Sequence, residues 1–374
     1  MLPIIPCEHK GGRMGLVKLF FDARYIKTDF HDGISRYSAE LGSALAKITP
    51  VTFIICDQAQ VKFLPPNSRT ILLHKPTSAR EPFTSLILNK YKPDVVFSPM
   101  QTMGSVGKRF KLILTLHDLI YYRHRTPPPQ LSAVIRTGWR IYHTTYIPQR
   151  TTLNQADMIA TVSRTSKADI LATRLTRRPL VVIPNAAQDL KRFLNSDVDT
   201  SSQPRNLVYM GSFMRYKNVE ALIAGMEFLP GRKLHLLSRI SPTRKAELAG
   251  CIPKDAEVIF HGGVSDKEYA KILASNAALV SASRDEGYGL PLAEALKLGI
   301  PAVVSDLEIH REVAGRGALY FPPNHPQVFA EQIKKLDDDE MRQNLIAEGT
   351  EHIAQYSWED SARRLLEAAQ RLNN

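Results

Sequence analysis

Two glutamates eight residues apart, Glu286 and Glu294, stand in the part of the chain with the clearest chemical character. Between them, Gly287 and Gly289 permit close backbone approach and unusual dihedral angles. Pro291 then suits the first turn of a helix, where its missing amide hydrogen is not needed. The start of such a helix offers unpaired amides beside a glycine turn, which suits a diphosphate. Because a carboxylate would repel that anion, we expect both glutamates to accept hydrogen bonds from hydroxyl groups that flank it.

Three further residues could contribute to such a site, although each also has an ordinary structural explanation. Lys217 follows a glycine turn, whereas a lone lysine is more often a solvated surface charge. His117 comes directly after an apolar run, where a histidine is more often structural than catalytic. Gly33 permits close approach where a helix is expected to open, or it merely starts that helix. The glycine turn before Lys217 and the strand end before His117 favour positions in a cleft.

The apolar pattern predicts a scaffold that brings these distant loops together. The predicted strands of the first half are residues 17–21, 51–55, 70–73, 95–98, 112–116, 158–162 and 180–183. A second series is predicted at residues 206–210, 233–237, 258–260, 278–281 and 302–305. Helical patterns include residues 34–46, 131–154 and the amphipathic stretch 358–372. Strands that alternate with helices imply parallel, doubly wound sheets.

Two such series predict an α/β protein with two Rossmann-like, doubly wound domains that face a central cleft. A polar stretch with little periodicity, residues 187–205, is the expected linker. We therefore divide the chain into residues 1–187, residues 188–356 and a closing helical segment, residues 357–374. Open α/β sheets bind ligands at the carboxyl ends of their strands, so the cleft is the expected site.

The composition is that of a globular protein, since 44% of the 374 residues are hydrophobic and 23% are charged. No apolar run reaches the length of about 18 residues that would predict a membrane-spanning helix. Residues 1–13 lack the pattern of a secretory signal and are expected to be a disordered extension or a start-site artefact. Cys7, Cys56 and Cys251 form no metal or redox spacing, which predicts a cytoplasmic protein.

The net charge is unevenly distributed along the chain. Residues 1–190 hold 26 Lys and Arg against 12 Asp and Glu, a balance of +14, whereas the remainder holds 23 against 25. A basic half attracts nucleic acid, anionic lipid headgroups or phosphorylated substrates. A merely solvated basic surface explains a modest excess but fits such one-sidedness less well.

Metal-dependent chemistry has little support in the sequence. The D-x-D spacing of Asp197-Val198-Asp199 lies in the polar linker with no strand before it, so we expect these carboxylates to be solvated. Asp337 to Glu340 is interpreted as an exposed acidic turn. No H-E-x-x-H motif, P-loop or G-x-G-x-x-G fingerprint is present. We therefore expect chemistry that requires no metal.

The segment from Glu286 to Pro301, E-G-Y-G-L-P-L-A-E-A-L-K-L-G-I-P, resembles the E-x7-E signature of glycosyltransferase family 4. This is a large family of retaining enzymes with the GT-B fold. Two solvated glutamates on an ordinary turn would explain a lone E-x7-E, but the interleaved glycines and prolines argue against chance agreement. Residues 260–264 resemble the family's nucleobase turn, and residues 209–218 resemble its diphosphate loop. Residues 32–37 and the pair His117-Asp118 also match family segments.

The resemblance implies that residues 1–187 carry the acceptor side, that residues 188–356 bind a sugar nucleotide, and that residues 357–374 pack back on the first domain. The catalytic residues that it implies are Glu286, His117 and Lys217. The donor-binding residues that it implies are Gly33, Ser212, Arg215, Lys217, Gly262, Gly287, Tyr288, Gly289, Leu290 and Glu294.

One position departs from the family's commonest pattern. The diphosphate loop usually has an arginine where Ser212 stands, so either Arg215 or Arg239 is expected to supply that charge. Several mannosyl- and rhamnosyltransferase-like members resemble this sequence in the same respect. This departure at Ser212 therefore bears on which sugar nucleotide is the donor.

The function implied by the resemblance is a retaining hexosyltransferase with a nucleoside-diphosphate sugar as co-substrate and no cofactor. GDP-mannose is the preferred donor, because the diphosphate loop and residues 312–315 resemble mannosyltransferase members. UDP-hexoses stay open, and the acceptor would be a glycan or a lipid-linked molecule. The alternatives are a sugar-nucleotide-binding protein without turnover and an epimerase of the same fold. A nucleic-acid-binding protein is supported by charge alone, without any recognisable module, so no specific nucleic acid is expected.

The basic first half leads to a further expectation, an anionic membrane surface as a partner, at the inner face of the plasma membrane. The candidate basic residues are Lys108, Arg109, Lys111, Arg123, Arg125, Arg136, Arg140 and Arg150. Trp139, Tyr142 and Tyr146 would supply apolar contact with the membrane, or else they belong to the core.

Overall fold

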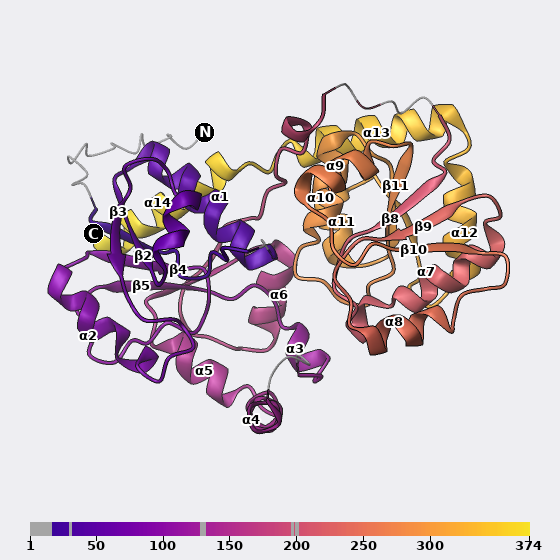
Figure 1. The fold of residues 1–374 in the computed structure, drawn as a ribbon. Coiled ribbons are helices and arrows are strands. Elements are labelled where there is room, and N and C mark those ends of the chain that lie inside the picture. The colour runs from indigo at the N-terminus through magenta and orange to yellow at the C-terminus, as the bar shows by residue number, and fades with distance from the viewer. Residues whose placement is uncertain (1–16, 30–31, 128–131, 196–197, 199–201) are drawn as a thin grey trace, which may run out of the picture.

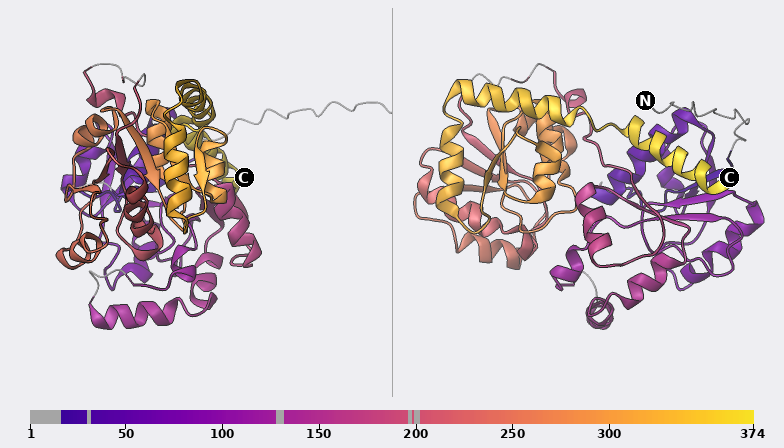
Figure 2. Two further views of the ribbon diagram at one scale, coloured as in Figure 1. Left: turned by 90° about the vertical axis from the view of Figure 1, so that its right-hand side faces the viewer. Right: turned by 180° about the vertical axis from the view of Figure 1, so that it is seen from behind.

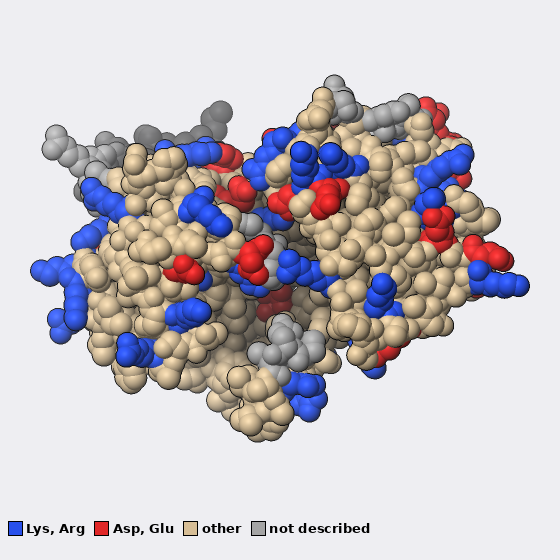
Figure 3. Space-filling model, viewed as in Figure 1, with Lys and Arg blue, Asp and Glu red and all other residues tan. Residues whose placement is uncertain are grey.

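The chain forms two α/β domains side by side, each built around one parallel sheet (Figure 1). The structure is a computed structural model that describes residues 17–29, 32–127, 132–195, 198 and 202–374. The surface is hollowed between the two domains (Figure 3). The predicted fold class is therefore confirmed, and the predicted extension at residues 1–13 lies outside the described residues.

The first sheet has seven parallel strands in the order β3-β2-β1-β4-β5-β6-β7. Their bounds are β1 Leu19–Asp22, β2 Val51–Ile55, β3 Arg69–Leu72, β4 Val95–Ser98, β5 Lys111–Thr115, β6 Met158–Thr161 and β7 Leu180–Val182. Every residue of β1 and β4 is buried, as expected for central strands covered by helices on both faces. The helices of this domain are α1 Gly33–Ile48, α2 Thr84–Leu88, α3 Ile120–Arg123, α4 Ala133–Tyr142, α5 Ile147–Asn154 and α6 Arg164–Ala172.

The second sheet has six parallel strands in the order β10-β9-β8-β11-β12-β13. Their bounds are β8 Asn206–Tyr209, β9 Lys233–Leu236, β10 Glu257–Phe260, β11 Ala277–Ser281, β12 Ala302–Ser305 and β13 Leu319–Phe321. The helices that follow these strands are α7 Val219–Gly225, α8 Pro242–Ala249, α9 Asp266–Leu273, α10 Leu290–Leu298, α11 Glu308–Ala314, α12 Pro326–Lys335 and α13 Asp339–Ile353. Leu234, Val280 and Phe329 belong to the apolar core of this domain.

Each sheet reverses its strand order at one place. In the first sheet β1 lies between β2 and β4, and in the second β8 lies between β9 and β11. The chain leaves the two strands at such a switch point in opposite directions, so a crevice opens at their carboxyl ends. The loops after β8 and β11 therefore meet at one crevice, and these two loops carry Lys217 and Glu286.

The last helix, α14 Trp358–Asn373, returns to the first domain and packs against α1, β4 and β5 (Figures 1 and 2). The Trp358 indole meets the ring of Tyr37 edge-on at a centroid distance of 6.0 Å. The Ser361 hydroxyl donates to the carbonyl oxygen of Pro184 at 2.7 Å. The chain thus crosses between the domains twice, once after β7 and once between α13 and α14.

The predicted linker begins in the interior of the protein. Ala187 and Leu190 are each only 2% exposed and pack in a core that draws residues from both domains. Lys297 of α10 donates to the carbonyl oxygen of Ala187 at 3.0 Å. The two aspartates of the D-x-D spacing in this linker, Asp197 and Asp199, lie outside the described residues.

The predicted helix over residues 131–154 was wrong as a single element. The chain instead forms α4 and α5, separated by a turn at residues 143–146. Pro148 lies in the first turn of α5, and a proline disfavours helical geometry in the residue before it.

The apolar pattern of the sequence also missed β13, a short edge strand of three residues. Across the described residues, no helix is long and apolar enough to cross a bilayer.

Candidate active site

The Lys217 ammonium and the Glu286 carboxylate meet at the switch point of the second sheet. Their nitrogen and oxygen atoms are 2.6 Å apart, and both side chains are about 15% exposed. The Ser283 hydroxyl also donates to the Glu286 carboxylate, at 2.8 Å. Burial opposes ionisation of Glu286, but the charge of Lys217 and these hydrogen bonds hold its pKa below the ordinary value. Glu286 is therefore an ionised acceptor at neutral pH.

Helix α10 begins beside this pair, on a glycine turn. Gly289 has a φ of +92°, a left-handed conformation that favours glycine, and Pro291 lies in the first turn. A Cβ at Gly289 would lie 3.6 Å from the ring of His310, which is buried beside the turn. The His310 Nδ1–H donates to the carbonyl oxygen of Ser305 at 2.7 Å. Burial lowers the pKa of His310, so a neutral imidazole lies against the start of α10.

Glu294, in the second turn of α10, pairs with a residue of the other domain. Its carboxylate contacts the guanidinium of Arg36 in α1, and the same guanidinium reaches Asp266 of α9 at 3.0 Å. Glu294 is only 2% exposed. Burial raises its pKa, while the charge of Arg36 acts in the opposite direction. The second glutamate of the signature is thus held by an arginine from across the cleft.

The start of α1 lies directly against the start of α10. Asp32 caps α1, accepting a hydrogen bond from the Ser35 amide at 2.9 Å. A Cβ at Gly33 would lie 3.6 Å from a methyl group of Leu290. Two predicted donor-site residues, one from each domain, are therefore brought together at the cleft.

His117 and Asp118 follow β5 and lie on the first-domain side of the cleft. The His117 Nε2 contacts the carbonyl oxygen of Pro99 at 2.8 Å, so this nitrogen carries the proton and Nδ1 is an acceptor in the neutral ring. Burial lowers the pKa of His117. Asp118 faces the signature loop, since a Cβ at Gly287 would lie 2.6 Å from its carboxylate. Burial, with the nearby charge of Asp285, raises the pKa of Asp118 to about 6.

An ion pair closes the rim of the cleft next to Glu286. The guanidinium of Arg123 in α3 makes two hydrogen bonds to Asp285, at 2.5 and 2.6 Å, and one to Asp169 at 2.8 Å. The ring of His124 stacks on that of Tyr216, the residue before Lys217, at a centroid distance of 5.2 Å. These contacts fix the first domain against both loops of the switch point.

The other predicted donor-binding residues lie around this centre. Ser212 and Arg215 are exposed on the loop before Lys217, and Gly262 lies exposed on the turn after β10 with a φ of +72°. The side chain of Arg239 lies across the neighbouring Gly263, where a Cβ would be 2.7 Å from its Cγ. Tyr288 is buried and its ring meets Tyr356 edge-on, so its side chain points into the packed junction between the domains.

Sequence reasoning assigned no role to three residues that the structure places in the site: Arg36, Asp118 and His310. Arg36 and Asp118 stand in motifs that were recognised, but nothing in their spacing showed which carboxylate or loop they would face. For His310, the available signal was its place shortly after the predicted strand 302–305, where a loop reaches the cleft.

Two family models match the chain, and each corresponds to one domain. Residues 31–188 match the model described as Glycosyltransferase Family 4, and residues 192–352 match the model described as Glycosyl transferases group 1. Together these matches span most of the chain. The chain belongs to glycosyltransferase family 4. The two matches meet between β7 and β8, where the glycosyltransferase passes from its first sheet to its second.

Mannosyltransferases are among the relatives of this family 4 chain. It is 27% identical over 169 residues to O-antigen chain mannosyltransferase B of Escherichia coli, covering 43% of this chain and 44% of that protein. It is 36% identical over 91 residues to the O-antigen chain mannosyltransferase RfbU of Salmonella typhimurium, covering 24% and 25% of the two chains. The matched regions thus span less than half of the length of these relatives.

Solved structures share the fold over nearly the whole chain. Sucrose-phosphate synthase from Thermosynechococcus elongatus matches with a TM-score of 0.72 at 20% identity, covering 95% of this chain and 98% of that one. HepE from Anabaena, in complex with UDP and glucose, matches with a TM-score of 0.68 at 14% identity, covering 94% and 99%. These likenesses confirm the two-domain GT-B fold.

Proposed function

We propose that this chain transfers a hexose from a sugar nucleotide to an acceptor hydroxyl, with retention of the anomeric configuration. The observation that carries the proposal is the Lys217–Glu286 pair at the switch point, on a loop whose Gly287 and Leu290 face Asp118 and Gly33 of the other domain. Family membership supports the reaction class, and the pair supports the place where the donor binds. The proposed co-substrate is a nucleoside-diphosphate sugar, without a cofactor or a metal.

The charges of the site suit departure of a nucleoside diphosphate. Breaking the glycosidic bond builds positive charge on the sugar and negative charge on the diphosphate. Lys217 and the amides at the start of α10 would stabilise the leaving diphosphate. Glu286 would accept hydrogen bonds from sugar hydroxyls, and Glu294 from the ribose. The neutral His117 would face the transferred sugar through a nitrogen that can accept a hydrogen bond.

GDP-mannose is the donor that we favour, with UDP-hexoses as the second candidate. The two mannosyltransferase relatives and the serine at position 212 of the diphosphate loop support mannose. The complex of HepE with UDP and glucose supports the second candidate by fold alone. For the acceptor we propose a glycan or a lipid-linked molecule, since the relatives are named for O-antigen chains.

A thermal-shift comparison of GDP-mannose, UDP-glucose, GDP and UDP tests the donor proposal. A ligand that binds the native state raises the Tm, and we expect the largest rise with GDP-mannose. Lys217→Ala should remove most of that rise, whereas Lys271→Ala, an exposed lysine of α9, should retain it. A protein whose Tm responds to no sugar nucleotide would contradict the proposal. Release of GDP from GDP-mannose would show turnover, which a protein that only binds the donor lacks. A product whose sugar is still mannose would exclude an epimerase.

We also propose that the protein works in the cytoplasm, docked through α4 on the inner face of an anionic membrane. No residue of α4 is buried, and Val134, Ile135 and Ile141 are 83%, 55% and 66% exposed. Arg136 and Arg140 lie on the opposite side of the same helix. A helix with one aliphatic face and one basic face suits the boundary of a bilayer.

The residues that the sequence predicted for the membrane surface differ in whether they are engaged in contacts within the protein. Trp139 packs edge-on against Tyr121 at 5.2 Å, so this aromatic residue joins α4 to the domain, and the exposed aliphatic residues take its proposed role. Lys108 is paired with Asp157 at 2.6 Å, and Arg123 is engaged across the cleft. The basic residues best placed for a membrane are therefore Arg136 and Arg140.

Co-sedimentation with vesicles of graded anionic lipid content tests the docking. We expect binding that rises with the anionic fraction and falls with added salt. A variant with Val134→Ser and Ile141→Ser should bind much less. Leu72→Ser, at a leucine of β3 that is 56% exposed on another side of the domain, serves as its control. Binding that ignores lipid charge and salt would refute the docking without touching the donor proposal.

A further inference from the structure

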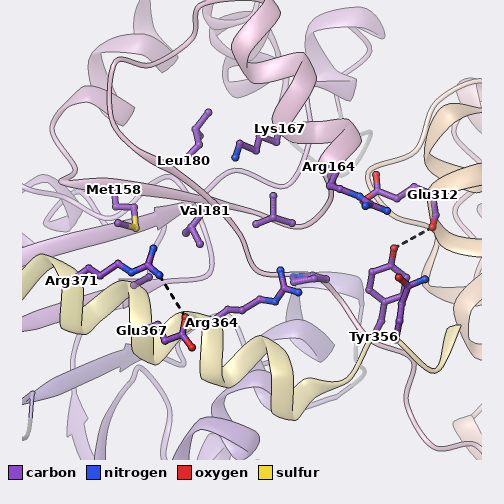
Figure 4. Close-up of a pocket in the computed structure, with 14 residues that line it drawn as sticks. Met158, Arg164, Lys167, Leu180, Val181, Glu312, Tyr356, Arg364, Glu367 and Arg371 are labelled. Carbon is purple, nitrogen blue, oxygen red and sulfur yellow. Dashed lines mark hydrogen bonds and ion pairs between the residues drawn. The ribbon is translucent and has the colours of Figure 1, made fainter. Parts of the chain in front are cut away.

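A cavity of about 390 Å³ lies between α6 and α14, on the side of the first domain where β7 forms the free edge of the sheet (Figure 4). Its floor is apolar and includes Met158 and Val181. Its end is formed by Glu312 and Tyr356, which lie at the junction with the second domain. The volume falls in the range of about 300–1000 Å³ that small-molecule sites occupy. We call this cavity the hinge groove.

The charge of the hinge groove is positive. Arg164 and Lys167 of α6 form one wall, and Arg364 and Arg371 of α14 form the other (Figure 4). The two carboxylates that line the groove, those of Glu312 and Glu367, already have partners: Glu367 lies 3.8 Å from Arg371. Within the described part of the chain, the ammonium of Lys167 and the guanidinium of Arg364 have no ion pair. Two cations on opposite walls are thus left for a ligand.

Glu312 links the hinge groove to the candidate active site. Its carboxylate accepts hydrogen bonds from the amides of Arg164 and Thr165, at 2.7 and 2.8 Å, and from the Thr165 hydroxyl at 2.7 Å. It thereby caps α6 from the other domain. On the same turn, the Ser163 hydroxyl lies 3.4 Å from the carbonyl oxygen of Gly287 in the signature loop. Lys167 lies one helical turn after Arg164, whose guanidinium is 3.5 Å from Glu312, so an anion held by Lys167 would compete with Glu312 for Arg164 and act on the contact between the domains.

We propose that the hinge groove binds a small organic phosphate and that this binding alters donor affinity through Glu312. The phosphate would lie between Lys167 and Arg364, since two cations on opposite walls match a dianion. The organic part would pack on Met158 and Val181. Binding of the phosphate to the groove does not depend on the proposed transferase function. Only the effect on donor affinity rests on that proposed function.

Calorimetric titration with phenyl phosphate tests the site, because this probe joins a dianion to an apolar ring. With saturating GDP-mannose in the candidate active site, we expect saturable binding that is tighter than binding of inorganic phosphate. Lys167→Gln and Arg364→Gln should each weaken it by about tenfold. Arg363→Gln is the matched control, since Arg363 is the next residue of α14, pairs with Asp360 and does not line the groove. In the absence of GDP-mannose, Lys217→Ala should leave the affinity of the groove for phenyl phosphate unchanged.

Three results would overturn the proposal. The first is the absence of saturable binding, and the second is equal weakening by Arg363→Gln and Arg364→Gln. The third is displacement of phenyl phosphate by anionic phospholipid vesicles through Lys167 and Arg364, which would make the groove a lipid headgroup site instead. For the coupling, we expect the donor dissociation constant to change about fivefold or more with phenyl phosphate bound, and not in the Arg364→Gln variant.

Discussion

At the scale of single residues, the site is a set of buried charges whose ionisation is set by their neighbours. Glu286 is kept ionised by Lys217, whereas Asp118 is buried with other carboxylates nearby and holds its proton more tightly. Glu286 belongs to the glycine loop of the second domain, and Asp118 faces that loop from the first domain. Perturbed pKa values of this kind gather where charge changes during a reaction.

Glu286→Gln should lower turnover by roughly 10²–10³, because one preorganised contact to the developing charge is lost. Glutamine keeps the size of the side chain, and its oxygen can still accept a hydrogen bond from Lys217, so the protein should stay folded. The measurement is the initial rate at saturating donor, with Glu308→Gln on the exposed start of α11 as the control. A rate near that of the unaltered protein would remove Glu286 from the reaction.

Asp118→Asn should stabilise the protein at neutral pH. The pKa of Asp118 is raised from 3.8 to about 6 in the folded protein, so the folded state binds a proton that the unfolded state has lost between these values. Its contribution to the free energy of unfolding is full below the unfolded pKa and is lost as the pH rises through about 6. Asparagine cannot ionise and can still accept the hydrogen bond from the Ile120 amide.

The expected difference between the two proteins is up to about 3 kcal/mol at pH 7.5 and close to zero near pH 4. Urea unfolding of both proteins across this pH range measures it. A difference that stays constant with pH would show that Asp118 does not titrate in this way.

At the scale of elements, the cleft is held by contacts between helices of opposite domains. Arg36 in α1 meets Glu294 in α10, Arg123 in α3 meets Asp285, and Glu312 in α11 caps α6. Each contact places a carboxylate of the second domain against a donor of the first. Domain closure over a donor would have to preserve or exchange these pairs.

Arg36→Met should destabilise the protein by roughly 3–5 kcal/mol, because Glu294 would be left as a buried carboxylate without its counter-charge. Adding Glu294→Gln should recover part of that loss, so a double-mutant cycle should give a coupling above about 1 kcal/mol. The control is Lys47–Glu359, an exposed pair at 3.7 Å that also starts from α1, for which the coupling should stay below about 1 kcal/mol. Equal coupling for both pairs would refute a special role for Arg36.

At the scale of the whole molecule, the charges of the cleft and of the outer surface have separate roles. Arg123, Arg36 and Lys217 are committed to pairs that line the cleft. Other basic side chains lie on the outside: Arg136 and Arg140 of α4 face a proposed membrane, and Lys167 and Arg364 of the hinge groove face a proposed phosphate (Figures 3 and 4). Within residues 1–190, which carry the excess of +14, Arg36 and Arg123 thus line the cleft, Arg136 and Arg140 lie on α4, and Arg164 and Lys167 line the hinge groove.

Chelation of divalent metal should leave the reaction rate unchanged. The ammonium of Lys217 and the amides at the start of α10 would carry the leaving-group stabilisation that a metal provides in other enzymes. The measurement is the initial rate with and without EDTA, at the donor concentration that saturates the Tm shift. Activity that EDTA abolishes and manganese restores would refute the metal-free proposal.

The sequence by itself determined the fold class, and it predicted most strands to within one or two residues. Both follow from local causes, because a buried parallel strand is apolar along its length and glycine and proline punctuate the helices. It also predicted that the loops of Lys217 and Glu286 reach a common cleft, since both follow strands of one parallel sheet. It could not show that they form an ion pair.

Only the tertiary structure decided which partners these residues meet. Arg36 and Glu294 are 258 positions apart, and their contact depends on how α1 of one domain packs against α10 of the other. The same holds for Trp139, whose exposure depends on whether Tyr121 lies beside it, and for the hinge groove, which forms only because α14 returns to the first domain. No local propensity encodes contacts between residues so far apart in the sequence. These contacts follow from the packing of the two domains and from the path of the chain between them.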